Sequence, residues 1–430
     1  MKFFGSMEVV YNELYLGGIS TIELSKEYGT PLYVIDEEEI RNKCRRYLSS
    51  FENNGRNRVA YAGKAFLPLA MCKLIEEEEM YLDIVSGGEL FTAYKSGFPL
   101  DRIYFHGNNK TIGEIEMGVS LGVGTFVVDN FYEMELISKI AKEKAVDQRV
   151  ILRITPGVEA HTHEYIKTGQ IDSKFGFTML NNNTIEAVKK AIELENVYLA
   201  GLHCHIGSQI FDIQPYEDAV EIMLNIIEKI KQDTGYIMEE LDLGGGFGIY
   251  YKDGDTPKSI EEFSKAILDK ANAVAESLHM KLPILTIEPG RSIVGNAGIT
   301  LYTVGTIKDI PKVRKYVSVD GGMTDNIRPA LYRAQYESVI ANNIISDEVE
   351  EVTISGKCCE SGDILLSDVK LSKVESGDIL AIMSTGAYGY SMASNYNKIP
   401  RPPVIMVNKG ESRVICKRES YQDIINNEFI

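Results

Sequence analysis

The chain has 430 residues, of which 44% are hydrophobic and 25% are charged, and its formal net charge is −17. This is the balance of a soluble globular protein with room for two domains, or for one barrel with an attached domain. The negative charge argues against nucleic acid or an anionic membrane as a partner, because both bind clustered lysine and arginine. We interpret the charge itself as an aid to solubility.

The sequence shows no sign of membrane insertion, secretion or a disulfide framework. Its longest apolar runs are strand-sized, far short of the ~20 residues that span a bilayer, and the start of the chain lacks the apolar core of a signal peptide. The six cysteines have neither CxxC spacing nor a dense arrangement. They are therefore interpreted as reduced thiols of a cytoplasmic protein, not as disulfides or a zinc site.

Eight short β-rich runs alternate with stretches of helical periodicity. The runs are residues 58–65, 81–89, 102–109, 124–130, 149–157, 198–208, 240–248 and 284–291. Helical stretches between them include 67–79, 130–145 and 259–278. This alternation predicts an α/β fold with a (β/α)8 TIM-type barrel over residues 38–296. A doubly wound sheet is the alternative, and the count of eight favours the barrel.

From about residue 297 the helical period gives way to short alternating stretches separated by Gly, Asp and Ser. This texture predicts a mostly β second domain over residues 297–430. Residues 1–37 have similar character, and the extended TPLYVID at 30–36 would complete that second domain before the barrel begins.

Polar, titratable or glycine residues follow all eight predicted barrel strands, where barrels of this kind place their catalytic groups. They are Lys64, Asp83, Ser86, His106, Asp129, Arg153, His205, Ser208, Gly244, Gly245, Gly246, Glu288 and Arg291. Strands must end in something polar, so chance explains some of these. A lysine, a histidine, a glutamate and a triple glycine together indicate a site.

Two of these features suit a covalently held phosphate cofactor. Lys64 follows the apolar VAYAG, whose neighbours would desolvate the amine and lower its pKa, as a Schiff-base nucleophile requires. A solvated surface lysine is the plainer interpretation. Residues 244–246 offer three backbone N–H groups with no Cβ in the way, which suits a phosphate, although a tight barrel turn explains them equally well.

Glu288 and His205 suit the ring of such a cofactor. A carboxylate that holds a proton on the pyridine nitrogen of pyridoxal phosphate (PLP) makes the ring a better electron sink; a structural salt bridge of Glu288 with Arg291 is the alternative. His205 would lie flat against the ring. Because alternate strand residues point to opposite faces, His203 and His205 are not expected to chelate one ion, and no metal is predicted.

The second domain carries further candidates. KCCESGD places the thiol of Cys359 beside the carboxylate of Glu360, although such a pattern alone more often forms a turn with a buried cysteine. Arg328, Tyr332 and Tyr388 are suited to anionic ligands, but their spacing does not prove it.

Several motifs occur along the chain in a recognisable order. They are YAGKA, DIVSGGEL, TGQIDSKFG, HCHIGSQI, LDLGGGFGIYY, IEPGRSIV, DGGMTDNIRPALY, CCESGD and GAYGYSMASNYN. Together they resemble the diaminopimelate decarboxylases, of the alanine-racemase-like (fold type III) PLP enzymes, from about residue 8 to about 405. EPGR and GGGFG mark the wider decarboxylase group, whereas SKFG, CESGD, IRPALY and the GAY…YN stretch are more specific. The chain departs from the family's usual Pro-Arg-Pro-Ala-Glu-Val only where Pro403 and Val404 stand.

The resemblance implies a role for each matching position. Lys64 would carry PLP, Glu288 would pair with the pyridinium nitrogen, and His205 would stack on the ring. The phosphate would be surrounded by Ser208, Gly244, Gly245, Gly246, Gly290, Arg291 and Tyr388. The distal carboxylate of the substrate would be held by Arg291, Arg328, Tyr332 and Tyr388, and its distal amine by Glu360. Cys359 would be the proton donor and would enter from the other subunit, so the resemblance implies a homodimer with shared active sites.

The activity that the resemblance implies is PLP-dependent decarboxylation of meso-2,6-diaminopimelate at its D-centre, which yields L-lysine and carbon dioxide. A related PLP decarboxylase of ornithine, arginine or carboxynorspermidine is the first alternative. A non-catalytic binding protein of the same fold is opposed by the presence of both Lys64 and Cys359. A racemase would need a second proton-transfer residue opposite Lys64.

Overall fold

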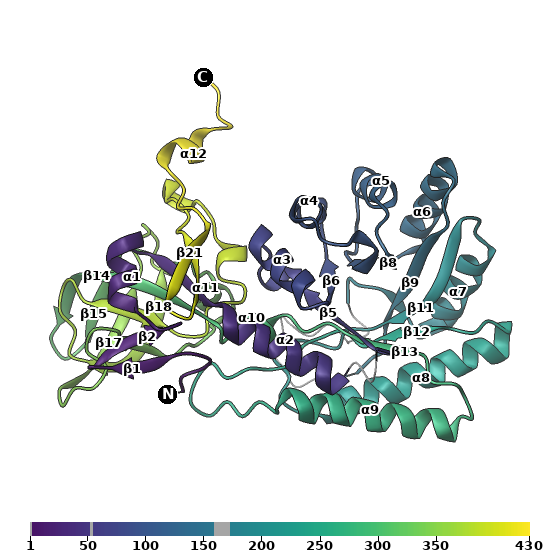
Figure 1. Ribbon diagram of the computed structural model, residues 1–430, viewed down its shortest axis with the longest axis horizontal. Helices are drawn as coiled ribbons and strands as arrows, with labels where there is room; N and C mark the ends of the chain where they lie inside the picture. The colour runs from purple at the N-terminus through teal and green to yellow at the C-terminus, as the bar shows by residue number, and fades with distance from the viewer. Residues whose placement is uncertain (1, 52–54, 159–172) are drawn as a thin grey trace. The chain divides into compact units, whose positions relative to one another are not determined.

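The computed structural model describes residues 2–51, 55–158 and 173–430 (Figure 1). The chain forms two compact units. The first, which we call the β unit, comprises Met1–Asn42, Ile249–Asp255 and Ile293–Ile430. The second, the barrel unit, comprises Lys43–Gly248 and Thr256–Ser292.

The barrel unit contains eight parallel strands that close into a ring, with an additional short strand, β10 (Phe177–Thr178), beside β9. The ring consists of β5 (Arg58–Ala62), β6 (Tyr81–Ile84), β7 (Ile103–Phe105), β8 (Thr125–Val128), β9 (Gln148–Thr155), β11 (Val197–His203), β12 (Glu240–Asp242) and β13 (Ile284–Ile287). Pairing of β13 with β5 completes the closure. The predicted barrel is confirmed, and a doubly wound sheet is excluded because a closed ring has no edge strands. Each observed strand ends before its predicted run does, since those runs included the loop that follows.

Helices follow the strands and surround them in Figure 1. They are α2 (Glu37–Phe51), α3 (Leu69–Glu77), α4 (Gly87–Ser96), α5 (Ile112–Leu121), α6 (Phe131–Lys144), α7 (Asn183–Glu193), α8 (Gln214–Thr234), α9 (Ile260–Ser277) and the short α10 (Arg291–Val294). Several begin at a side-chain cap that satisfies an otherwise unpaired backbone N–H: Ser86, Thr111, Asn130 and Ser259 each accept from the residue three positions on. The capped starts fix the length of the loops that end on the carboxyl side of the barrel.

A buried carboxylate closes the amino-terminal end of the barrel. Glu240, at the start of β12, accepts from Arg58 at 2.8 Å and from Arg149 at 2.7 Å, and from the hydroxyls of Tyr104 and Thr286. Above it the interior is filled by Ala60, Tyr104, Val127, Ile151 and Ala200. The barrel is therefore packed from below, as such barrels are, and only its carboxyl end is available for chemistry.

The β unit contains two sheets. The small one is β1 (Glu8–Val10), β2 (Glu13–Leu16) and β3 (Ile19–Ser20). The large one runs in the order β18 (Ile364–Ser372), β17 (Val349–Ser355), β15 (Arg314–Val319), β14 (Gly298–Ile310), β4 (Leu32–Asp36), β20 (Val404–Asn408) and β21 (Glu411–Cys416), with β16 (Ser338–Ile340) and β19 (Ile379–Ile382) attached. Short helices α11 (Arg328–Tyr332) and α12 (Tyr421–Ile425) lie between and after the strands.

The amino-terminal segment contributes one strand to the large sheet and one helix. β4, which contains most of TPLYVID, pairs antiparallel with β14 and parallel with β20. Residues Thr21–Tyr28, which share a β-like texture in the sequence, form helix α1 instead. Ser20 accepts from the N–H of Ile22 and so starts the helix, and Leu24 is buried on its inner face. No helix among the described residues has both the length and the apolar composition needed to cross a membrane.

Candidate active site

The carboxyl ends of the barrel strands carry the predicted cofactor residues. Lys64 lies in a 3-10 turn (Gly63–Ala65) directly after β5, His205 follows β11, and Glu288 follows β13. Lys64 is exposed while Gly63 and Ala65 are buried. The expected burial of the Lys64 side chain is therefore not observed in the chain by itself, although its charge acts on Asp83 and His205 at the same end of the barrel.

His205 presents a neutral ring. Burial, together with the charges of Lys64 and Arg153, holds the pKa of His205 well below its usual value. Its Nδ1 accepts from the N–H of Gly245 at 3.3 Å, which orients the imidazole against the glycine turn. A neutral, oriented aromatic ring beside the lysine is suited to packing against a planar cofactor.

Glu288 contacts two histidines that come from other strands. Its Oε1 lies 2.6 Å from Nε2 of His106, which follows β7. Its Oε2 lies 3.3 Å from Nε2 of His203, the last residue of β11. Burial alone would raise the pKa of Glu288, but the two imidazoles outweigh it and hold this pKa well below the usual value. Glu288 is thus an anion at neutral pH although it is only 6% exposed.

Further acids surround this carboxylate. Burial raises the pKa of Asp242, at the end of β12, well above its usual value, and the charge of Glu288 adds to the rise. The pKa of Asp83, on β6, is also raised by burial, although His106 opposes this. Only one of the three carboxyl groups therefore carries its charge easily, because like charges in a buried site disfavour one another.

His106, His203 and Glu288 place ligand-type atoms within 4.8 Å of one another. We interpret this group as a charge network, because Nε2 of His106 and Oε1 of Glu288 lie 2.6 Å apart, as in a direct ion pair. His203 and His205 have different neighbours: His203 faces Glu288, and His205 accepts from Gly245. They therefore do not converge on one point.

The glycine turn after β12 is required by packing. A Cβ on Gly245 would lie 2.1 Å from the carbonyl oxygen of Glu288, and one on Gly246 would lie 2.3 Å from that of Gly207. Gly290 similarly brings the turn after β13 against Ala62, with a Cβ contact of 2.9 Å. Two of the backbone N–H groups are engaged within the chain: that of Gly244 donates to Oδ1 of Asp242 and that of Gly245 to Nδ1 of His205. Packing therefore explains this turn more directly than an open phosphate cradle does.

A basic side chain lies beside this turn. Arg291, the first residue of α10, donates from Nη2 to Oγ of Ser208 at 2.8 Å. A guanidinium and a hydroxyl next to a bare backbone form a donor set that suits a phosphate.

Arg328, in the β unit, is buried among tyrosines. Its Nη1 donates to the hydroxyls of Tyr251, at 3.1 Å, and Tyr336. Its guanidinium carbon lies 5.1 Å, 5.6 Å and 5.9 Å from the ring centroids of Tyr251, Tyr336 and Tyr388. Burial alone would lower the pKa of Arg328, but the tyrosines outweigh it and raise the pKa, so this cation is permanent. Tyr332 lies at the end of the same short helix, partly exposed.

The loop between β17 and β18 carries the predicted thiol and carboxylate. Cys359 and Glu360 are both exposed, whereas Cys358 is buried. Burial and the nearby Asp363 raise the pKa of Cys358 to about 11, so Cys358 is the structural cysteine that the plainer interpretation expected. The backbone N–H of Cys359 donates to Oδ1 of Asn397 at 2.9 Å, which anchors this residue of the loop.

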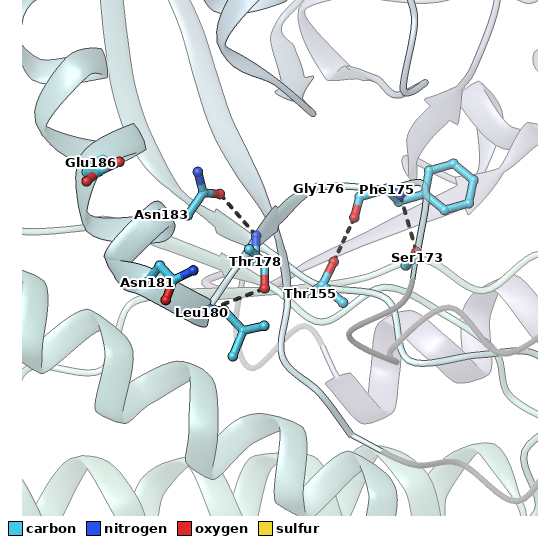
Figure 2. Close-up of a pocket in the computed structure, with 9 residues that line it drawn as sticks. All are labelled: Thr155, Ser173, Phe175, Gly176, Thr178, Leu180, Asn181, Asn183 and Glu186. Atoms are coloured by element: carbon cyan, nitrogen blue, oxygen red, sulfur yellow. Dashed lines mark hydrogen bonds between the residues drawn. The ribbon is translucent and has the colours of Figure 1, made fainter.

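A cavity of about 400 Å³ lies at the carboxyl end of β9 (Figure 2). It is lined by Thr155, Ser173, Phe175, Gly176, Thr178, Leu180, Asn181, Asn183 and Glu186. Thr155 donates to the carbonyl oxygen of Phe175 at 2.7 Å, and the Phe175 ring covers the guanidinium of Arg153 at 4.2 Å. The SKFG part of the TGQIDSKFG motif thus forms a wall next to the barrel mouth; TGQID lies outside the described residues.

The structure adds residues to which the sequence assigned no role. His106 and Asp83 were recognised only as strand ends, while His203, Asp242, Tyr251 and Tyr336 were not assigned to the site. A signal existed for Asp242, since an acid between two leucines in ELDLGGG is a buried acid. Nothing in the sequence indicates that His106 and His203 meet at Glu288, because their strands are not neighbours along the chain.

Comparison with known proteins agrees with this geometry. Residues 37–295 match the pyridoxal binding domain of the pyridoxal-dependent decarboxylases. Diaminopimelate decarboxylase of Bacillus methanolicus is 50% identical over 97% of this chain and 98% of its own length. That of Bacillus subtilis (strain 168) is 49% identical over 96% of this chain and 95% of its own. The chain belongs to the diaminopimelate decarboxylase family.

Solved structures of the family have the same fold. Diaminopimelate decarboxylase of M. jannaschii superimposes with a TM-score of 0.93 at 38% identity, covering 99% of this chain and 98% of that one, and was also solved with L-lysine. A lysine/ornithine decarboxylase from Vibrio vulnificus, at 22% identity and a TM-score of 0.76, shares the fold. The predicted fold class, family and decarboxylase activity are confirmed, and the cofactor is pyridoxal 5'-phosphate.

The barrel residues fit this cofactor. An exposed lysine amine, a neutral histidine ring, a buried anionic carboxylate and a guanidinium–hydroxyl pair beside bare glycine backbone all lie at one end of the barrel. These are the groups that an aldehyde, an aromatic ring, a pyridine nitrogen and a phosphate each require.

Proposed function

We propose that this protein decarboxylates meso-2,6-diaminopimelate at its D-configured centre and releases L-lysine and carbon dioxide, the last step of lysine biosynthesis. One observation favours this substrate above the alternatives. Arg328 is buried and charged, and among the described residues no carboxylate forms an ion pair with it. A buried cation without an anion is costly, so the site calls for an anionic ligand. Diaminopimelate has a distal carboxylate, whereas ornithine and arginine have none.

Each barrel residue contributes a defined action. Bound pyridoxal phosphate supplies an electron sink for the electron pair that remains when carbon dioxide leaves. Lys64 holds the cofactor through its ε-amine, and His205 packs against the ring. Glu288, already an anion, keeps a proton on the pyridine nitrogen. The phosphate group is held by Ser208, Gly244, Gly245, Gly246, Gly290 and Arg291 of the barrel unit, together with Tyr388 of the β unit.

The β unit contributes recognition and the proton. Arg328 and Tyr332, with Arg291, bind the distal carboxylate of the substrate, and Glu360 binds its distal amine. An analogue without these groups leaves buried polar side chains unpaired, an arrangement that can discriminate by ~10⁴-fold. Cys359 gives its thiol proton to Cα after carbon dioxide has left.

We infer a homodimer with shared active sites. Cys359 and Glu360 are exposed on their own chain, whereas a proton donor and an ion-pairing carboxylate act best where water is excluded. A second chain would cover this loop and receive both residues in its barrel. In this arrangement residues 38–296 bind the cofactor, and residues 1–37 and 297–430 serve the substrate site and the interface. All six cysteines are free, which supports a cytoplasmic enzyme.

The test is product analysis of the PLP-loaded protein incubated with meso-diaminopimelate, ornithine, arginine and carboxynorspermidine in parallel. Lysine with an equal amount of carbon dioxide from the first substrate alone supports the proposal. A diamine from ornithine or arginine, an inverted amino acid, or no product from any of them would overturn it. Arg328→Gln should lower kcat/KM for diaminopimelate by roughly 10²-fold or more, as expected when a charged recognition pair is lost. Tyr198→Phe, which changes a tyrosine that is 40% exposed on the barrel unit, is the control.

A further inference from the structure

Each oxygen of the Glu288 carboxylate lies within ion-pair distance of an imidazole nitrogen, and all three side chains are buried: His106 is 4% exposed, His203 1% and Glu288 6%. The two histidine rings contact each other edge to face, with centroids 4.9 Å apart and planes at 72°. We propose that His106 and His203 are positioning residues that act through Glu288, holding its carboxylate in the one orientation that binds the cofactor ring. The proposal rests on the role proposed for Glu288.

The arrangement spans the mouth of the barrel. β7, β11 and β13 supply one residue each, and β12 alone separates β11 from β13 in the ring. A glutamate side chain has three rotatable bonds, so an isolated Glu288 would have to be ordered when the cofactor binds. Two imidazoles on different strands fix both ends of the carboxylate beforehand, and pre-ordering of this kind lowers the cost of binding.

The histidines also offset the neighbouring acids. The titratable groups that face this network from the surrounding elements include Lys64, Asp83, Glu89, Arg153, Cys204, His205 and Asp242. Asp83 and Asp242 would each drive Glu288 toward its protonated form, in which it could not keep a proton on the pyridine nitrogen. His106, at 2.6 Å, is the contact that opposes them most directly.

The decisive measurement is the affinity of the apoenzyme for PLP, titrated by absorbance. We would compare wild type, His106→Gln, Glu288→Gln and the double variant. If His106 acts through Glu288, each single change weakens PLP binding by roughly 10- to 100-fold, the range for partners that orient a ligand-binding side chain. The double variant is then hardly weaker than Glu288→Gln alone, because coupled residues are non-additive. His279→Gln is the matched control, since this histidine is exposed beyond α9.

A second readout follows the acid side of the pH profile. The PLP affinity of wild type should persist on acidification, since the pKa of Glu288 is depressed. In His106→Gln this pKa rises, so the affinity should be lost at a higher pH than in wild type. His203→Gln, which removes the longer 3.3 Å contact, should shift the profile in the same direction by less.

The outcomes distinguish a failure of the role proposed for Glu288 from a failure of the positioning role proposed for the histidines. If Glu288→Gln binds PLP like wild type, the role of Glu288 fails and the inference with it. If Glu288→Gln binds weakly while His106→Gln is unaffected, or if the two losses simply multiply, only the positioning proposal is overturned. Thermal unfolding of each apoenzyme detects a variant that fails to fold; a folded His203→Gln with wild-type affinity and pH profile would then overturn the proposal for His203.

Discussion

Two buried glutamates lie at opposite ends of the same barrel and are paired with different kinds of side chain. Glu240, at the amino end, is paired with two guanidiniums, Arg58 and Arg149, that stay charged at every physiological pH. Glu288, at the carboxyl end, is paired with two imidazoles and stands among further acids. The first carboxylate is fully compensated by the protein itself. The second keeps a charge whose balance depends on neighbours that can titrate, and such groups are typical of sites that do chemistry.

The different pairing of the two glutamates indicates that the amino end of the barrel serves stability and the carboxyl end serves catalysis. Burial would raise the pKa of Glu240, but Arg58 and Arg149 outweigh it and lower the pKa, so Glu240 is an anion that never needs another partner. Substitutions at the amino end should therefore reduce stability with little effect on catalysis. Substitutions at the carboxyl end should impair catalysis without lowering stability.

The largest effect is expected for Lys64→Ala. The lysine is exposed, and we propose that it holds the cofactor. The change should therefore abolish decarboxylation, by at least ~10³-fold, while the free energy of unfolding of the apoenzyme changes by less than ~0.5 kcal/mol. Carbon dioxide release and borohydride trapping of the cofactor on the chain measure the first, and denaturant unfolding measures the second. Lys95→Ala, on the outer helix α4, is the matched control. A variant that still traps PLP would contradict the assignment.

The converse is expected at the other end for Glu240→Gln. The change leaves Arg58 and Arg149 without their anion and should lower the free energy of unfolding by about 3–5 kcal/mol, the cost of breaking a buried ion pair. The folded fraction should keep its PLP affinity and its kcat. Thermal unfolding and a titration with PLP test the two halves. A Glu240→Gln variant that loses cofactor affinity but keeps its stability would contradict the structural role assigned to the amino end.

Asp242→Asn tests the titratable side of the comparison. The folded-state pKa of Asp242 is raised, so the folded protein binds this proton more tightly than the unfolded chain, and stability is lost as pH rises from the ordinary aspartate pKa to the raised one. Asparagine is neutral throughout and keeps an acceptor for the N–H of Gly244. The variant should be more stable than wild type at pH 7, and the difference should vanish in acid. Unfolding curves of both proteins over pH 4–8 measure this difference in stability. A difference that does not change with pH would contradict the raised pKa of Asp242.

The smallest effect is expected for an exposed carboxylate, Glu261. Arg46 donates to it through two nitrogens, and mainly this contact lowers its pKa to about 2. Both side chains are about half exposed, however, so solvent screens the pair. Glu261→Gln should change the free energy of unfolding by no more than ~0.5–1 kcal/mol. This variant provides the baseline against which the effect of Glu240→Gln is measured.

Most of the architecture could be predicted from local patterns. All eight barrel strands were located because buried parallel strands are continuous apolar runs, and the helices between them have a clear 3.6-residue period. Residues Thr21–Tyr28 show where this fails. Their helix is set by the Ser20 cap and by burial of Leu24, signals that are weak beside a run of β-branched residues.

The site was predicted unevenly. Lys64, His205 and Glu288 follow strands, and the barrel rule places such residues at one end without any knowledge of distances. The predicted burial of the Lys64 side chain is not observed, because residues that are neighbours in the sequence do not have to surround a side chain in space.

What the amino-acid sequence by itself determined was the set of elements, the barrel, the family and the candidate cofactor residues, since each of these depends on local periodicity or on motifs read in order. What only the tertiary structure decided was which charges meet. His106 and His203 reach Glu288, and Tyr251 and Tyr336 surround Arg328, across long separations in the chain. Electrostatic energy depends on distance and burial, and both exist only after the strands have closed into a ring and the chain has folded back on itself.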